Sequence, residues 1–218
     1  MTTRNPRTWT WGDLADVLSE MIDQQSHGIP RIRLEQRHVA GLRALPDRHV
    51  LLSHLTHGGR GCEIGVDQGD FTASIVDTLA PSKLYLVDPW SSERYGQEKY
   101  DTVVRRFAKE IEAESVEIIR ARSEEAAALI EDASLDWVYI DSDHSYATTK
   151  QELELFSAKL RPGGILSGHD YVQGNLRKAL KYGVVEAVHE FCVSNDWEFA
   201  FLTMEQPSNP SFALRKLT

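Results

Sequence analysis

The sequence lacks the residues on which several classes of protein depend. Only two cysteines, Cys62 and Cys192, occur among its 218 residues. Two thiols so far apart in sequence cannot build a disulfide framework or a zinc cluster. No run of about 18 apolar residues is present, so the sequence predicts no membrane-spanning helix and no membrane partner. The first residues also lack the apolar core of a signal peptide, and we therefore expect a cytoplasmic protein.

Positive charge is scarce as well. Lysine and arginine number 24 against 33 aspartates and glutamates, which gives a net charge of −9. Proteins that grip nucleic acid mainly through its phosphates need a basic surface, so we expect no nucleic-acid partner. Apolar residues make up 41% of the chain, which is enough for the core of one domain.

Strands and helices alternate along most of the chain. Residues 8–25 and 31–55 carry apolar side chains at helical spacing and predict N-terminal helices. From Gly59 onward, short apolar runs alternate with amphipathic segments, and two strands end the chain. This pattern predicts an α/β fold: a Rossmann-like, doubly wound sheet of about seven strands, mainly parallel with a C-terminal antiparallel strand. We expect an N-terminal helical cap segment, residues 1–56, before a ligand-binding domain, residues 57–218.

Two segments late in the chain carry their own predictions. Residues 175–195 have helical spacing and predict one continuous helix. Residues 161–164 contain a proline and two glycines, and they predict the turn between a helix and the next strand.

The first predicted strand runs into a glycine turn that is followed by a helix. Gly65 and Gly69 permit a sharp turn and a close approach to a ligand, and the helix N-terminus offers N–H groups to an anion. The spacing is not G-x-G-x-x-G, which disfavours nicotinamide-dependent enzymes. Asp88 ends the second strand, about 20 residues on, and suits a ribose diol. An ordinary turn and a helix-capping aspartate are the alternatives.

Polar residues also follow the later strands. Trp90 is a candidate to stack on a purine, although a lone tryptophan is more often part of a core. Ser123 is a candidate for the adenine edge or for a simple N-cap. His144 lies beside Asp141 and other acids that would raise its basicity, so it is a candidate general base. The alternative is a loop histidine that caps the next helix.

A metal site is the last prediction from the residues alone. His169 and Asp170 end the fifth strand and are expected near Asp141. Two carboxylates and an imidazole are able to hold a divalent ion such as Mg, Mn, Fe or Zn. A hydrogen-bonded polar cluster without metal is the alternative.

Several motifs together resemble a known family. The segments GCEIGVDQGDFT, LYLVDPW and LDWVYIDSDHSYATTKQELELFSAKLRPGGILSGHDY, with the C-terminal strand pair, resemble class I S-adenosylmethionine-dependent methyltransferases. They are most similar to small bacterial O-methyltransferases related to the macrolide-sugar and cephalosporin-type enzymes. The resemblance covers roughly residues 57–218, the expected S-adenosylmethionine-binding methyltransferase domain.

The resemblance assigns roles to the candidate residues. His144 and Asp141 would be catalytic, with His144 as the general base. His169 and Asp170 stand where the relatives carry two metal-binding acids, and with Asp141 they would form the metal site. One acid is replaced here by histidine. The implied cofactor contacts come from Glu63, Gly65, Gly69, Thr72, Asp88, Trp90, Ser123 and Asp141.

The resemblance therefore implies O-methylation of a small molecule or a sugar hydroxyl. A nicotinamide-dependent oxidoreductase and a non-catalytic S-adenosylmethionine-binding domain are the alternatives, and a nucleic-acid methyltransferase is disfavoured by the net charge. The expected partner is a small-molecule methyl acceptor, and a homo-oligomer stays open. An acidic acceptor would suit the N-terminal arginines, whose alternative is a solvated helix face. These arginines are Arg31, Arg33, Arg37, Arg43 and Arg48.

Overall fold

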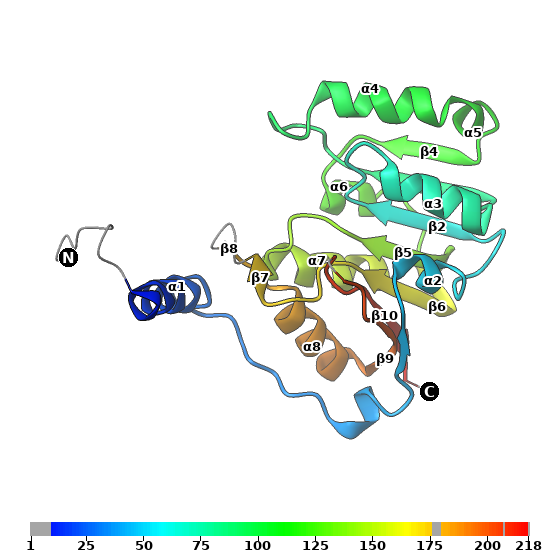
Figure 1. Ribbon diagram of the computed structural model, residues 1–218. Helices are drawn as coiled ribbons and strands as arrows, with labels where there is room; N and C mark the ends of the chain where they lie inside the picture. The colour runs from blue at the N-terminus through cyan, green and yellow to red at the C-terminus, as the bar shows by residue number, and fades with distance from the viewer. Residues whose placement is uncertain (1–9, 176–179, 207, 218) are drawn as a thin grey trace.

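An eight-stranded sheet forms the centre of the fold (Figure 1). The computed structural model describes residues 10–175, 180–206 and 208–217. The strand order in the sheet is β1-β9-β10-β6-β5-β2-β3-β4, and β7 and β8 form a separate two-stranded sheet. The strands are β1 (Arg43–Leu45), β2 (Arg60–Ile64), β3 (Lys83–Val87), β4 (Val116–Ile119), β5 (Leu135–Ile140), β6 (Leu160–Gly168), β7 (Gly174–Asn175), β8 (Leu180–Lys181), β9 (Trp197–Thr203) and β10 (Phe212–Lys216).

The strand directions confirm the predicted topology. In the large sheet only β10 runs antiparallel to its neighbours β6 and β9, and the other pairs are parallel. Ile64 pairs with both Val87 and Ile140, and Ile140 pairs with Gly168. The carboxyl ends of four neighbouring strands are therefore level, and the loops that follow them meet at one edge.

Helices cover both faces of the sheet. They are α1 (Trp11–Gln25), the 3₁₀ turn η2 (Gln36–His38), α2 (Arg48–Leu52), α3 (Asp70–Leu79), α4 (Gln97–Arg106), α5 (Ala108–Glu112), α6 (Ser123–Ala127), α7 (Tyr146–Ser157) and α8 (Val184–Asn195). Strand β5 is buried on both faces: Val138 and Ile140 join a core with α6, α7 and α8, whereas Trp137 and Tyr139 join a core with α2, α3 and α4. Such two-sided burial is typical of a mainly parallel sheet.

The helix predicted over residues 31–55 is wrong. This segment is extended up to η2 and then forms β1, which pairs in parallel with β9, and the short helix α2. Pro46 interrupts the apparent helical pattern because it lacks an N–H and disfavours a helical residue before it. Asp47 then starts α2 by accepting the N–H groups of His49 and Val50, each at 2.9 Å. The boundary at residues 56 and 57 stays a prediction.

The continuous helix predicted over residues 175–195 is also wrong. Asn175 belongs to β7 and Leu180 to β8, Gly183 is the N-cap of α8, and residues 176–179 lie outside the described part of the chain. Strand β6 likewise begins at Leu160, so residues 161–164 belong to the strand and are not the predicted turn.

The first helix, α1, lies beside the body of the fold and is joined to it by an extended segment (Figure 1). It begins at Trp11, and the rest of its predicted range, Thr8 to Trp9, lies outside the described residues. No helix of the described chain is both long and apolar enough to cross a membrane.

Candidate active site

The loops at the carboxyl ends of the strands surround a cavity of about 810 Å³, a volume typical of a small-molecule site. Its wall contains most of the predicted site residues. Those that line it are Glu63, Gly65, Asp88, Trp90, Ser123, Asp141, His144 and Asp170. Gly69, Thr72 and His169 do not line it.

The glycine turn adopts a backbone that only glycine tolerates well. Gly65 has a φ of +86°, and a Cβ at this position would overlap the carbonyl oxygen of Asp141. Gly69 has a φ of +80° and is the N-cap of α3. Both glycines are therefore required by the turn, which lines the cavity at Gly65 and leads into α3 at Gly69.

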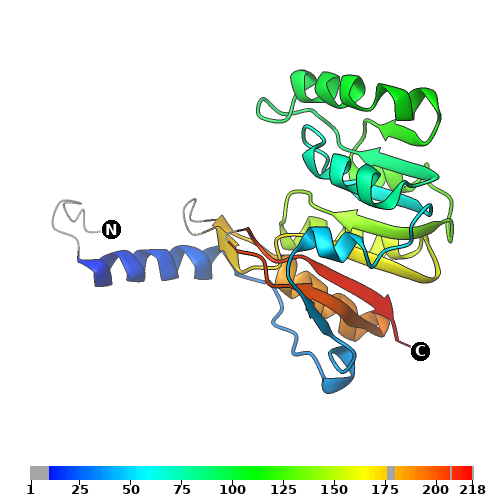
Figure 2. The same ribbon diagram turned by 45° about the vertical axis from the view of Figure 1, so that its right-hand side comes forward.

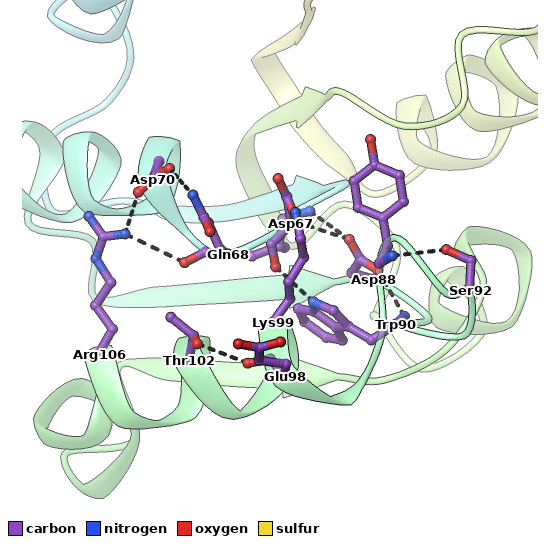
Figure 3. A network of polar contacts seen from close by, with 12 residues as sticks. Asp67, Gln68, Asp70, Asp88, Trp90, Ser92, Glu98, Lys99, Thr102 and Arg106 are labelled. Carbon is purple, nitrogen blue, oxygen red and sulfur yellow. Dashed lines mark hydrogen bonds and ion pairs between the residues drawn. The ribbon is translucent and has the colours of Figure 1, made fainter.

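Asp88 holds this turn in place (Figure 3). Its Oδ2 accepts the backbone N–H groups of Val66 and Asp67 at 3.0 and 3.1 Å, and its Oδ1 accepts that of Trp90 at 2.9 Å. A carboxylate accepts about four hydrogen bonds, so one position remains for a ligand hydroxyl. Contact between Asp88 and a ribose stays a prediction.

Trp90 packs against the glycine turn and is hydrogen-bonded to it. It is only 1% exposed, and its indole N–H donates to the carbonyl of Asp67 at 2.8 Å. Helix α4 adds two ion pairs to the same turn, Lys99 with Asp67 and Arg106 with Asp70 (Figure 3). The turn is therefore preorganised by the protein, and the stacking of Trp90 on adenine stays a prediction.

Glu63 and Thr72 lie beneath the turn. The hydroxyl of Thr72 donates to Glu63 Oε2 at 2.5 Å, and Glu63 is 1% exposed. Burial raises the pKa of Glu63 to about 8, and the negative charges of Asp141 and Asp88 add to this effect. Glu63 is therefore a carboxyl group that changes charge close to neutral pH.

Ser123 lies in the first turn of α6, where Arg122 and not Ser123 is the N-cap. Beside it, burial raises the pKa of Glu152 to about 7, although hydrogen bonds from Ser142 and Ser123 partly offset the effect. The Ser142 hydroxyl donates to Glu152 Oε2 at 2.6 Å. This carboxyl anchors the loop after β5 to α7.

His144 and Asp170 form an ion pair at the wall of the cavity. Their Nε2 and Oδ2 atoms are 2.9 Å apart. Burial alone would lower the pKa of His144, but the hydrogen bond and charge of Asp170, with the charges of Asp141 and Asp143, raise it above its ordinary value. Both residues have a positive φ, 64° and 56°, so the two loops are held in an uncommon backbone conformation.

The charge of Asp170 is stabilised from two sides. Burial would raise the pKa of this carboxyl, but hydrogen bonds from His144 and Asn209 lower it below its usual range. The Asn209 amide donates to Asp170 Oδ1 at 2.6 Å. Asp170 is therefore an anion that favours a positive charge on His144.

Asp141 faces two cations. Its Oδ1 lies 4.0 Å from His144 Nε2, and its Oδ2 lies 3.7 Å from an Arg48 guanidinium nitrogen. Burial raises the pKa of Asp141, against the opposing charges of His144 and Arg48. The Arg48 guanidinium also lies over the ring of Phe71, 4.5 Å from its centroid, which fixes its position.

His169 is turned away from the predicted metal site. Its Nδ1 is 2.9 Å from the Ser211 hydroxyl, which itself donates to Glu205. Because Ser211 has only one proton, His169 Nδ1 must be the donor, and Nε2 then carries a lone pair 3.8 Å from Asp170 Oδ1. Burial lowers the pKa of His169, which keeps the ring neutral.

The structure groups the predicted metal ligands differently from the sequence. Asp141, His144 and Asp170 each offer a ligand atom, and these atoms lie within 4.8 Å of one another. His144 takes the place expected of His169. Metal binding by Asp141, His169 and Asp170 stays a prediction.

Three residues of the site were missed as site residues in the sequence. Arg48 lines the cavity, whereas Arg37 pairs with Glu35 and Asp196 on the surface. Tyr182 packs against His144, with ring centroids 4.9 Å apart, and Asn209 holds Asp170. Only the cluster of arginines gave a signal, and it did not distinguish Arg48.

A comparison with protein families decides the class of protein. The model of a family described as a methyltransferase domain matches residues 62–171, which is half of the chain. The chain belongs to this methyltransferase family. The predicted resemblance is thereby confirmed: the protein is a class I S-adenosylmethionine-dependent methyltransferase, and the nicotinamide-dependent alternative is set aside.

Solved structures share the fold of this methyltransferase at low sequence identity. A candidate rRNA methylase from Clostridium thermocellum has a TM-score of 0.60 and 15% identity, over 78% of this chain and 94% of its own. A candidate methyltransferase from Streptococcus mutans, in complex with S-adenosylhomocysteine, has a TM-score of 0.56 and 16% identity, over 78% and 96%. A Corynebacterium glutamicum protein reaches 0.57 and 15% over 97% and 94%. No curated protein matches the sequence.

Proposed function

We propose that this methyltransferase transfers the methyl group of S-adenosylmethionine to a hydroxyl of a small molecule, with His144 as the general base. One observation carries the proposal. The 2.9 Å pair of His144 Nε2 and Asp170 Oδ2 lies in the wall of the cavity that also contains the glycine turn and Asp88.

The two nitrogens of His144 suit this role. Asp170 engages Nε2–H, and Nδ1 has no hydrogen-bond partner within the part of the chain that the structure describes. Nδ1 is thus available to take the acceptor proton while Asp170 orients the ring and stabilises the imidazolium, which is the division of labour of a catalytic histidine–aspartate pair.

The reaction is a single displacement. The acceptor oxygen forms a bond to the methyl carbon, and the carbon–sulfur bond breaks with its electron pair remaining on sulfur, which leaves S-adenosylhomocysteine. The hydroxyl proton goes to His144 Nδ1. The cofactor supplies the reactive group, so the protein contributes alignment and proton removal.

The charge and the lining of the cavity support a small acceptor. The net charge of −9 opposes a polyanionic substrate. Several solved structures with this fold are nevertheless described as rRNA or tRNA methyltransferases, so RNA belongs in the substrate screen. Tyr95, Leu180 and Tyr182 line the cavity and offer apolar surface to an organic acceptor, and Tyr182 packs against His144.

A divalent cation is a second means of activating the hydroxyl. Asp141, His144 and Asp170 each offer a ligand atom, and these atoms lie close enough together to hold such an ion. A donor set with imidazole favours Mn, Fe or Zn over Mg. When bound, the ion would lower the pKa of the acceptor hydroxyl.

Substitution of His144 tests the proposal. A panel of phenols, sugars, small hydroxy acids and RNA is first screened with methyl-labelled S-adenosylmethionine. We then expect His144→Ala to lower turnover by about 10²–10⁴-fold and to leave S-adenosylhomocysteine affinity unchanged. Because the pKa of His144 is raised, wild-type turnover should rise with pH through a value above 6.5, and the variant should lose this limb. His57→Ala, at an exposed loop histidine, is the control.

Each other outcome is informative. Unchanged turnover per folded molecule in His144→Ala would remove the base from the mechanism. Methylation of RNA alone would overturn the small-molecule substrate, and cofactor binding without any acceptor would favour the non-catalytic alternative. Full activity after chelation, with no metal by elemental analysis, would exclude the cation.

A further inference from the structure

Arg48 lines the cavity, yet removal of the acceptor proton does not use it. It is the first residue of α2, which packs beside α3 on one face of the sheet (Figure 2). Leu51 and Leu52 of α2 are buried in the same core as Phe71 of α3, and the Arg48 guanidinium lies over the Phe71 ring. The fold therefore holds this cation beside the helix that follows the glycine turn.

Arg48 is also the arginine of the cavity wall that is best placed to bind an anion. Arg122 is held in an ion pair of 2.7 Å with a glutamate of α6, and Arg94 belongs to the exposed loop between β3 and α4. Within the described residues, the one ion pair of Arg48 is with Asp141 at 3.7 Å, and Tyr139 is its other polar neighbour. A guanidinium carries five N–H donors, and an N–H···O hydrogen bond is about 2.7–3.2 Å long. Arg48 therefore keeps donors for a ligand in the cavity.

The charges around Arg48 match the amino-acid end of S-adenosylmethionine. This end carries an ammonium and a carboxylate on one carbon, and it is bonded to the same sulfur as the methyl group. If the methyl group faces an acceptor beside His144, the amino acid begins there too. Asp141 bridges the way from this point to Arg48, because its Oδ1 lies 4.0 Å from His144 Nε2 and its Oδ2 lies 3.7 Å from the guanidinium. The wall thus offers one anion and one cation, side by side, to a ligand group that carries both charges.

We propose that Arg48 binds the carboxylate of S-adenosylmethionine, while Asp141 faces its ammonium. The charges then follow one another as guanidinium, carboxylate, ammonium and aspartate, so each has an opposite charge beside it. The planar guanidinium is able to donate two parallel hydrogen bonds to a carboxylate, which adds specificity to the attraction. Arg48 thereby selects ligands that carry a complete amino acid. The assignment concerns the cofactor alone and holds whichever acceptor is methylated.

Calorimetric titration with three ligands tests this role without any methyl transfer. S-adenosylhomocysteine has the complete amino acid, its decarboxylated form keeps only the ammonium, and 5′-methylthioadenosine has neither charge. We expect Arg48→Met to lower the affinity for S-adenosylhomocysteine by about 10–100-fold, the range of a charge-assisted hydrogen bond. The affinity for methylthioadenosine should stay within a few fold, and that for the decarboxylated ligand should stay or rise, because Arg48 repels a lone ammonium. The matched control is Arg43→Met, whose guanidinium lies over Phe201 outside the cavity, and it should bind all three ligands as the wild type does.

Two further measurements guard against a variant that is merely misfolded. The wild type alone should bind the decarboxylated ligand at least 10-fold more weakly than S-adenosylhomocysteine, and Arg48→Lys, which keeps the charge, should lose less affinity than Arg48→Met. Thermal melting without ligand checks that each variant is folded. Equal losses for all three ligands would make Arg48 a structural support of the wall and would overturn the proposal. An unchanged affinity for S-adenosylhomocysteine would also overturn it, and weaker binding of an acidic acceptor in the same variant would assign the guanidinium to the acceptor instead.

Discussion

The buried Glu63 should make the stability of the protein depend on pH. Its pKa is raised from 4.5 to about 8 by burial, so the folded state holds a proton that the unfolded state releases above pH 4.5. Between these values the folded state binds more protons, and its stability therefore falls as pH rises. A shift of about 3.5 pKa units, at about 1.4 kcal/mol each, corresponds to a loss of about 5 kcal/mol by pH 8.

Glu63→Gln isolates this effect. Glutamine keeps an oxygen for the Thr72 hydroxyl, which lies 2.5 Å from Glu63 Oε2, and it has no proton to lose. Urea unfolding of both proteins from pH 5 to pH 8.5 should show the wild type losing about 4 kcal/mol relative to the variant, because part of the loss occurs below pH 5. Any constant cost of the amide cancels in this difference. The exposed Glu131→Gln serves as control, and a difference that stays flat with pH would refute the reasoning.

Two further substitutions test the cavity wall. Gly65→Ala should abolish S-adenosylhomocysteine binding in calorimetry, since its Cβ meets the carbonyl of Asp141, whereas Gly163→Ala has a similar φ of +83° but open space and should cost only about 1–2 kcal/mol of stability. Gly65→Ala that still binds tightly would contradict the geometry. Arg48→Met should raise the pKa of Asp141 further. As the pH is lowered, Asp141 should therefore lose its charge, and the cofactor affinity should begin to fall, at a higher pH than in the wild type. Arg43→Met, whose guanidinium lies over Phe201 outside the cavity, should leave this pH dependence unchanged.

The central strands were predictable because their signals are local. Each of β2, β3, β4 and β5 is a short apolar run that ends at a glycine or a polar residue, and burial on both faces requires such a run. Their alternation with helices then dictated parallel pairing, which placed Gly65, Asp88 and Asp141 at one edge.

The N-terminal segment was not predictable in the same way. β1 has only three residues, and its partner β9 lies about 150 positions later in the chain. The spacing of apolar residues reflects only contacts between near neighbours in the sequence. It therefore predicted a helix over residues 31–55 and gave no sign of the distant strand β9. For the same reason the sequence did not distinguish Arg48 from the other N-terminal arginines. The position of its guanidinium depends on Phe71, over whose ring it lies.

The choice between the two histidines shows where local reasoning ends. Both His144 and His169 follow strand ends that lie side by side, so the sequence placed both near Asp141 and Asp170. What separates them is Ser211, which is contributed by the chain just before β10 and engages His169 Nδ1. That contact turns His169 into a neutral ring behind the site and leaves His144 as the imidazole paired with Asp170. A residue 42 positions away thus decides which histidine meets the cavity.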